Sequence, residues 1–205
     1  NMMPVGGGGD AGRPGFAVQE ILSIRNQDDL NRVLHGFLES LTPAEFDLRE
    51  AYDYTMALPR TYYDSGSFDK WIRVGWALRN ISPNLFIVWV AFSAQATGFS
   101  YSSIRTDLWE RWSGFDVRAE HGLTKRSIMY WLKQDNPDAY DRILQGSVEQ
   151  MIDYTLESCL VANNATDSKR KAKGSGDYDI AVILYHLFRN DYKCVSVKAN
   201  VWYRF

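Results

Sequence analysis

Apolar residues recur at helical spacing through most of the chain, and the first clear stripe covers residues 28–41. Its apolar positions fall three or four residues apart, which predicts one amphipathic helix. These positions are Leu30, Val33, Leu34, Phe37 and Leu38. Thr42 and Pro43 then fit the N-cap and the first turn of a short helix. A further stripe over residues 50–58 ends before Pro59, because proline cannot continue a helix.

The densest helical pattern covers residues 68–80. Its inward positions follow the spacing i, i+3, i+4, i+7 and are Trp71, Val74, Gly75 and Leu78. Ser82 and Pro83 open a second helix that extends to about Ala94. This second segment is apolar on nearly all sides, so we expect it at the centre of the fold.

Three more helices are predicted after residue 101. The first begins at Ser102 or Ser103, and the second is capped by Thr124. The third starts at Pro137 and extends to about Cys159. The inward positions of the first two are Ile104, Leu108, Trp112, Ile128, Trp131 and Leu132. The predicted fold class is therefore mainly α, a compact helix bundle.

The two ends of the chain read differently from this bundle. Residues 1–15 are rich in glycine and indicate a flexible linker or residues added in cloning. Residues 163–176 are polar and charged, which predicts a solvated linker. Residues 177–188 then predict a helix, and residues 193–198 and 201–205 predict a β-hairpin, so a small α/β segment begins at the C-terminus. The chain stops in the middle of this pattern, which indicates a fragment of something longer.

The composition is that of a globular protein, with 45% hydrophobic and 14% aromatic residues. The formal net charge is −2, so no overall basic field points to a nucleic-acid ligand. Residues 1–68 hold five Lys or Arg against ten Asp or Glu, whereas residues 69–145 hold ten against eight. Any DNA-binding surface is therefore expected as a local patch after residue 69.

Cysteine usage and hydropathy indicate a soluble protein that is not secreted. Cys159 and Cys194 are too few for a disulfide framework or a zinc site, which favours reduced thiols in a cytosolic setting. The most apolar run, residues 85–92, is far shorter than the ~20 residues that span a bilayer. The Gly-rich start also lacks the basic and then apolar pattern of a signal peptide.

No catalytic pattern is complete in the sequence. A phosphate-binding loop needs a lysine and a hydroxyl after its last glycine, but Gly12 is followed by Arg13 and Pro14. Asp177 and Asp179 suit a metal-binding carboxylate pair, but acidic residues at a predicted helix start ordinarily complement the helix dipole. The histidines, none with a partner at ligand spacing, are His35, His121 and His186. We therefore expect no catalytic site, metal or cofactor within this chain.

Basic and aromatic residues interleave between residues 70 and 133, and they form the remaining candidate site. The cations are Lys70, Arg73, Arg79, Arg105, Arg111, Lys125, Arg126 and Lys133. The tryptophans among them are Trp71, Trp76, Trp109, Trp112 and Trp131. Cations that follow phosphates and rings that stack on bases suit a single strand of nucleic acid. The same residues also fit a bundle whose tryptophans form the core and whose charges form a solvated face, so both interpretations stay open.

The stretch from Leu58 to Leu78, which reads LPRTYYD and then FDKWIRVGWAL, carries a resemblance to a known family. It resembles the primase C-terminal helix-bundle family, as found in primase–helicases of large nucleocytoplasmic DNA viruses. The similarity continues through Trp89 and through residues 124–137. Residues 178–203 resemble the start of the poxvirus-type helicase N-terminal region, which precedes a superfamily 3 helicase in such enzymes.

The resemblance implies a domain layout. Residues 1–19 are a flexible linker, and residues 20–58 are a helical connector from the primase core. Residues 59–160 are the primase C-terminal helix bundle. Residues 161–176 are a polar linker, and residues 177–205 begin the helicase N-terminal region.

The resemblance also implies that the chain is the non-catalytic helical middle of a viral replicative primase–helicase. It would assist DNA primer synthesis and unwinding by holding single-stranded template or the initiating nucleotide. The parent protein is expected to use ATP and magnesium, to be hexameric, and to act in the host cytoplasm or the virion. The expected partners are single-stranded DNA and the primase and helicase domains of the same polypeptide, with no membrane.

An alternative is a structural connector or oligomerisation collar between the primase and the helicase motor. It predicts buried tryptophans, scattered charges and self-association without DNA. A template-holding module instead predicts a basic face and binding that weakens with salt. The two roles can be distinguished by whether four cations share one exposed surface, as the template-holding module predicts. These cations are Arg73, Arg79, Lys125 and Arg126. A third interpretation, an independent small enzyme, finds no catalytic cluster.

Overall fold

A computed structural model of the chain describes residues 18–115 and 122–164, four positions between residues 181 and 188, and residues 192–196 and 201–204. The chain divides into two compact units, Asn1–Pro137 and Asp138–Phe205. Each unit is described by itself.

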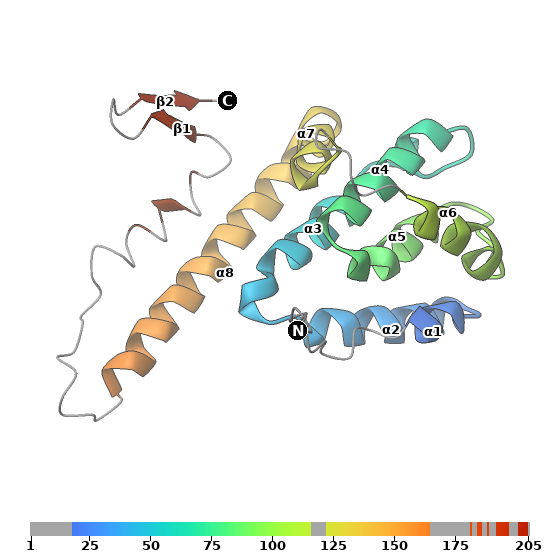
Figure 1. The fold of residues 1–205 in the computed structure, drawn as a ribbon, viewed down its shortest axis with the longest axis horizontal. Helices are drawn as coiled ribbons and strands as arrows, with labels where there is room; N and C mark the ends of the chain where they lie inside the picture. Colours follow the sequence, from blue (N-terminus) through green and yellow to red (C-terminus); the bar gives the residue numbers. More distant parts are fainter. Residues whose placement is uncertain are drawn as a thin grey trace, which may run out of the picture. The chain divides into compact units, whose positions relative to one another are not determined.

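The described part of the first unit is helical throughout (Figure 1). Its α-helices are α1 (Val18–Leu22), α2 (Gln27–Ser40), α3 (Phe46–Met56), α4 (Phe68–Ile81), α5 (Phe86–Ser93), α6 (Trp109–Gly114) and α7 (Lys125–Asp135). Short 3₁₀ turns join some of them, namely η1 (Pro43–Glu45), η2 (Arg60–Tyr62) and η3 (Pro83–Leu85). A π-helical segment, η4 (Ile104–Leu108), leads into α6. The predicted fold class, mainly α, is confirmed.

Helix α5 forms the centre of the first unit, as its hydrophobicity predicts. All eight of its residues are buried, and it packs against α2, α3 and α4. Trp89 of α5 has no exposed surface and stacks against Trp71 and Trp112, with ring centroids 4.7 and 5.6 Å away. The densest sequence pattern and the most apolar segment therefore meet in one aromatic core.

Side-chain caps mark several helix starts, including the predicted starts at Thr42 and Thr124. The Asn26 side chain accepts a hydrogen bond from the backbone of Asp29 at the start of α2. Thr42 and Glu45 form a capping box ahead of Pro43, and Thr124 caps α7. These contacts satisfy backbone N–H groups that have no partner inside the helix.

Two details differ from the sequence prediction. Helix α3 begins at Phe46 rather than at residue 50, because the capped turn η1 runs directly into it. Trp131 was expected to point inward with Ile128 and Leu132, which are buried, but it is only partly buried. The predicted inward row of Ile104, Leu108 and Trp112 is confirmed.

The second unit contains the long helix α8 (Pro137–Asn164), close to the predicted span, and a β-hairpin. Strand β1 (Tyr192–Ser196) pairs antiparallel with β2 (Val201–Arg204), as predicted, with Cys194 opposite Trp202 and an irregularity before Ser196. The backbone is helical at the four described positions of the predicted 177–188 helix. The predicted linker at residues 1–15 lies outside the described residues. Of the predicted linker at residues 163–176, the first two residues continue α8 and the rest lie outside the described residues. Among the helices that the structure describes, none is long and apolar enough to cross a membrane.

Candidate nucleic-acid interface

Helix α7 carries an exposed stripe of two cations and a ring. Arg126, Tyr130 and Lys133 are spaced i, i+4, i+7, so they lie on one face of the helix. All three side chains are exposed, and 62% of the Tyr130 surface is accessible to solvent. We call these three residues the α7 stripe.

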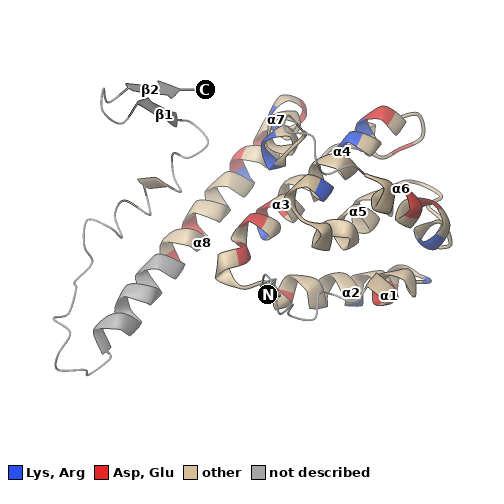
Figure 2. Cartoon of the chain, viewed as in Figure 1, with Lys and Arg blue, Asp and Glu red and all other residues tan. Residues whose placement is uncertain are grey.

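Helix α4 contributes two further cations beside α7, with which it is in direct contact. The Arg73 guanidinium lies 5.1 Å from the centre of the Trp131 ring, the residue next to Tyr130. Lys70 lies 4.4 Å from the centre of the Tyr62 ring and 3.8 Å from the Asp135 carboxylate. The surface of α4 and α7 that carries these five residues is called the α4–α7 face below. Trp131 and Asp135 lie on a different side of α7 from the stripe, so Lys70 and Arg73 form a separate group on it. Figure 2 shows Lys and Arg residues in blue on both helices.

A hydrogen bond anchors this face between the turn η2 and the end of α7. The Tyr62 hydroxyl donates to Asp135 over 2.7 Å. Burial raises the pKa of the Tyr62 phenol well above its usual range, and the bond to the Asp135 carboxylate raises that pKa further. Tyr62 therefore stays protonated and holds Asp135 beside Lys70 at every physiological pH.

Lys125 occupies a different position from the one expected of a DNA-binding cation. Its ammonium lies 2.5 Å from the Asp47 carboxylate and 2.6 Å from Glu50, and its side chain is only 15% exposed. Glu50 is itself buried, with 2% of its surface accessible. Lys125 therefore ties α7 to α3, and its charge is compensated by two carboxylates.

The other predicted cations lie away from the α7 stripe. Arg79 is half-buried over the Trp112 ring, and its Nε atom is buried with no hydrogen-bond partner among the described residues. Arg105 is exposed on η4. Arg111 of α6 donates to Asp107 over 2.8 Å and lies 5.3 Å from the centre of the Phe68 ring. The structure thus places Lys70 and Arg73 beside Trp131 and Asp135, Arg126 and Lys133 on the α7 stripe, and Arg111 beside Phe68, and it does not gather all eight.

The tryptophans divide between core and surface. Trp89 and Trp112 are buried, whereas Trp76 is 45% exposed and packs edge-on against Phe115. Within the described part of the first unit, the more exposed rings are Tyr130 and Phe68, neither of which was a predicted site residue. The spacing of Tyr130 between Arg126 and Lys133 is a sequence signal that could have identified the first. Nothing comparable in the sequence marks Phe68.

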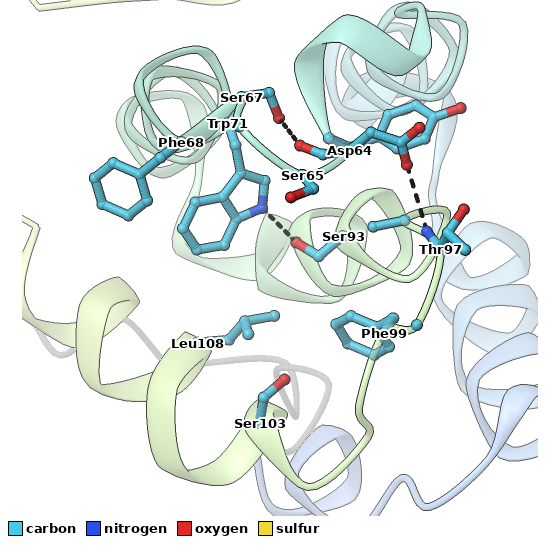
Figure 3. Close-up of a pocket in the computed structure, with 14 residues that line it drawn as sticks. Asp64, Ser65, Ser67, Phe68, Trp71, Ser93, Thr97, Phe99, Ser103 and Leu108 are labelled. Atoms are coloured by element: carbon cyan, nitrogen blue, oxygen red, sulfur yellow. Dashed lines mark hydrogen bonds between the residues drawn. The ribbon is translucent and has the colours of Figure 1, made fainter.

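A hollow of about 340 Å³ opens beside Phe68 (Figure 3). It is lined by residues 63–68 ahead of α4, by Trp71 and Ser93, by residues 96–99 after α5, and by Ser103 and Leu108 around η4. Trp71 and Ser93 face Leu108 and Phe99 across it. We call it the Phe68 hollow.

Two glycine turns and a hydrogen-bond network fix the walls of the Phe68 hollow. Gly66 and Gly98 have φ angles of 88° and 80°, in the left-handed region that favours glycine. The Asp64 carboxylate accepts from the Thr97 backbone over 3.4 Å and from Arg60 over 2.8 Å, which joins the two turns. The hollow is therefore built by contacts between segments that are more than thirty residues apart in sequence.

A metal centre finds no support in the described part of the chain. No group of three or more His, Cys, Asp or Glu residues there could hold a metal ion. His35 lies 3.1 Å from Glu39 on the surface of α2. His121, His186, Asp177 and Asp179 lie outside the described residues.

Comparison with known proteins confirms the resemblance to a primase C-terminal family. Residues 51–131 match the family described as Primase C terminal 2 (PriCT-2). The match runs from α3 to α7 and includes most of the α4–α7 face and the Phe68 hollow.

Individual relatives come from large nucleocytoplasmic DNA viruses. A protein named as a candidate helicase of Acanthamoeba polyphaga mimivirus is 24% identical over 139 residues, which is 67% of this chain and 12% of that protein. Proteins named as candidate primases from two isolates of African swine fever virus are 29% identical over 151 residues, 72% of this chain and 14% of each relative. The chain therefore spans about an eighth of the length of the relatives that it matches.

Proposed function

Since residues 51–131 match the primase C-terminal 2 family, we propose that this chain holds single-stranded DNA template for the primer synthesis of a viral primase–helicase. The observation that supports this role is the α7 stripe, in which an exposed Tyr130 stands between Arg126 and Lys133. In this proposal the chain itself performs no chemistry.

The physical argument rests on the two kinds of contact that a single strand offers. Cations follow its phosphates, and an aromatic ring stacks on any base because every base has a π-face. Tyr130 has 62% of its surface accessible, so its ring can stack without rearranging the core. Lys70 and Arg73 add two exposed cations on the neighbouring helix α4, which offer further phosphate contacts to a longer strand.

The alternative role as a connector or collar draws on other features of the same structure. Trp89 and Trp112 are buried, and Lys125 serves to join α3 and α7. Both features are expected of a rigid spacer. They do not account for an exposed ring between two cations, whose apolar surface stays in contact with water until a base covers it.

The parent protein supplies the remaining activity in this proposal. Because the relatives are named for primase or helicase activity, we place catalysis, ATP and magnesium binding, and a hexameric superfamily 3 helicase motor in parts of the polypeptide beyond this chain. Its site of action would be the host cytoplasm or the virion. The resemblance of residues 178–203 to a helicase N-terminal region stays a prediction.

The test is a fluorescence-anisotropy titration of labelled single-stranded DNA at low and moderate salt. We expect the Arg126→Ser/Lys133→Ser variant to bind more weakly than the unchanged chain. Arg32→Ser is the control. It also removes an exposed cation, since the Arg32 side chain is 73% exposed, but Arg32 is on α2, which lies away from α7 (Figure 1). Equal affinity for all three proteins, or no binding by a well-folded chain at low salt, would favour the connector.

A further inference from the structure

The Phe68 hollow is separate from the α7 stripe and has its own chemistry. Phe68 lies at the edge of the hollow and is 53% exposed. Keeping an apolar ring in contact with water is unfavourable in free energy. Trp71 lies beside it, with ring centroids 5.7 Å apart. The Arg111 guanidinium lies within 6.0 Å of both rings. Two rings tilted by 45° to one another and a planar cation therefore lie together at the opening of a hollow.

The polar lining of the hollow suits the edge of a planar, hydrogen-bonding ligand. Ser65 presents a hydroxyl at the rim, and Thr97 presents another that already accepts from Arg60 over 3.1 Å. The Asp64 carboxylate, whose side chain is 30% exposed, can accept a further hydrogen bond. An apolar peptide side chain would use the rings but make no hydrogen bond with these groups.

The size of the hollow limits its occupant to one small group. Its volume of about 340 Å³ is near the lower end of the range of about 300–1,000 Å³ for small-molecule sites. Part of its wall comes from the π-helical segment η4, through Leu108 and the adjacent Ser103. Single-turn π-helical segments are rare and occur frequently at functional sites.

From these features we infer that the Phe68 hollow binds one nucleobase, stacked on the exposed Phe68 ring beside Trp71, with its polar edge toward Asp64 and Ser65. The inference builds on the proposed function, because a protein that handles template meets both unpaired bases and free nucleotides. Either source supplies the same chemistry, a flat heteroaromatic ring with donors and acceptors on its edge.

Charge compensation limits phosphate contacts at the hollow. The two guanidinium groups near the hollow each lie against a carboxylate, Arg60 with Asp64 and Arg111 with Asp107, both over 2.8 Å. Binding in the hollow therefore depends mainly on stacking, which salt affects little. Binding on the α7 stripe depends on phosphate contacts, which salt weakens steeply.

The experiment uses the full 205-residue chain and follows the Trp71 indole signal by ¹⁵N–¹H NMR. That signal is a local reporter, because the Trp71 indole N–H donates to Ser93 over 2.8 Å in the wall of the hollow. The free-nucleotide arm compares ATP with inorganic tripolyphosphate. The strand arm compares oligodeoxythymidine with an abasic strand of equal length.

A shift of the Trp71 signal with ATP and not with tripolyphosphate would assign the hollow to a free nucleotide. A shift with the base-bearing strand and not with the abasic strand would assign it to a base of the template. Phe68→Ala should then weaken binding of that ligand by about 5-fold to 100-fold, as loss of a stacking ring does. Phe68→Tyr should restore it, since the ring is kept.

An unmoved Trp71 signal with every base-bearing ligand would overturn the inference. So would a Phe68→Ala variant that loses affinity equally for base-bearing and abasic strands. The Arg126→Ser/Lys133→Ser variant separates this result from the proposed function, because it should weaken both kinds of strand whether or not the hollow takes a base. If that variant binds strands normally while ATP still shifts Trp71, the template role fails and the nucleobase site stands.

Discussion

Gly75 of α4 lies directly against the Trp89 indole of α5. A Cβ atom at Gly75 would stand 2.7 Å from Trp89 Cε2, closer than such atoms approach in folded proteins. Trp89 cannot move aside easily, because it is fully buried and stacked between Trp71 and Trp112. The glycine in the family-like stretch FDKWIRVGWAL therefore allows the close packing of two helices that both the aromatic core and the Phe68 hollow depend on.

Gly75→Ala should destabilise the fold. The added methyl group displaces a packed indole, at a cost of about 1–3 kcal/mol, while alanine returns at most about 1 kcal/mol of helix propensity. Urea denaturation followed by tryptophan fluorescence measures the net loss. Gly146→Ala is the control, because a Cβ there meets no atom within 4 Å, and it should be neutral or stabilising. A Gly75→Ala variant as stable as the control would contradict the close packing.

Most of the fold could be predicted from the sequence because its signals are local. The spacing of Ile104, Leu108 and Trp112 and the cap at Thr124 depend on residues within a few turns of one another, and the structure has them where the pattern puts them. The central place of α5 also follows from its composition, since a helix that is apolar all round has no face for solvent.

The candidate site could be predicted only in part, because charge partners are not local. Lys125 meets Glu50 from 75 residues away, so no pattern around Lys125 reveals that its charge is compensated. The Phe68 hollow likewise depends on a contact between Asp64 and Thr97, 33 residues apart. Sequence spacing identified the exposed cations Arg126 and Lys133 but could not separate them from Lys125.

Lys125→Met should destabilise the chain strongly. It leaves the buried Glu50 carboxylate without its cation, and breaking such a pair from one side costs about 3–5 kcal/mol. The double variant Glu50→Leu/Lys125→Met should recover most of this loss, because both charges are then gone. Lys133→Met, on the exposed α7 stripe, should change the free energy of unfolding by less than about 0.5 kcal/mol. Equal effects of the two single lysine variants in urea denaturation would show that the ion pairs of Lys125 with α3 do not stabilise the fold.

Tyr62→Phe should alter how stability depends on pH. At neutral pH the variant loses the hydrogen bond to Asp135, a loss of about 1–2 kcal/mol. Because the folded-state pKa of Tyr62 is raised above the usual 10.0, its contribution is complete below pH 10.0 and declines as pH rises above that value, where the unfolded chain releases its proton first. The difference in unfolding free energy between Tyr62→Phe and the unchanged chain should therefore shrink in alkaline solution. A difference that stays constant from neutral to strongly alkaline pH would mean that the Tyr62 pKa is not raised by folding.

The α7 stripe makes a quantitative prediction about salt. Each cation that neutralises a phosphate of a single strand contributes about 0.7 to the slope of log affinity against log salt concentration, so Arg126→Ser/Lys133→Ser should reduce that slope by about 1.4. Tyr130→Ala should weaken binding by about 1–3 kcal/mol and leave the slope unchanged, because stacking on a base releases no counterion. Tyr130→Phe keeps the ring and should bind like the unchanged chain. Anisotropy titrations at several salt concentrations give both quantities from one data set. If Tyr130→Ala lowers the slope, or the double cation variant lowers affinity at an unchanged slope, then the cations and the ring do not divide their roles between phosphate and base, and the strand lies elsewhere on the bundle.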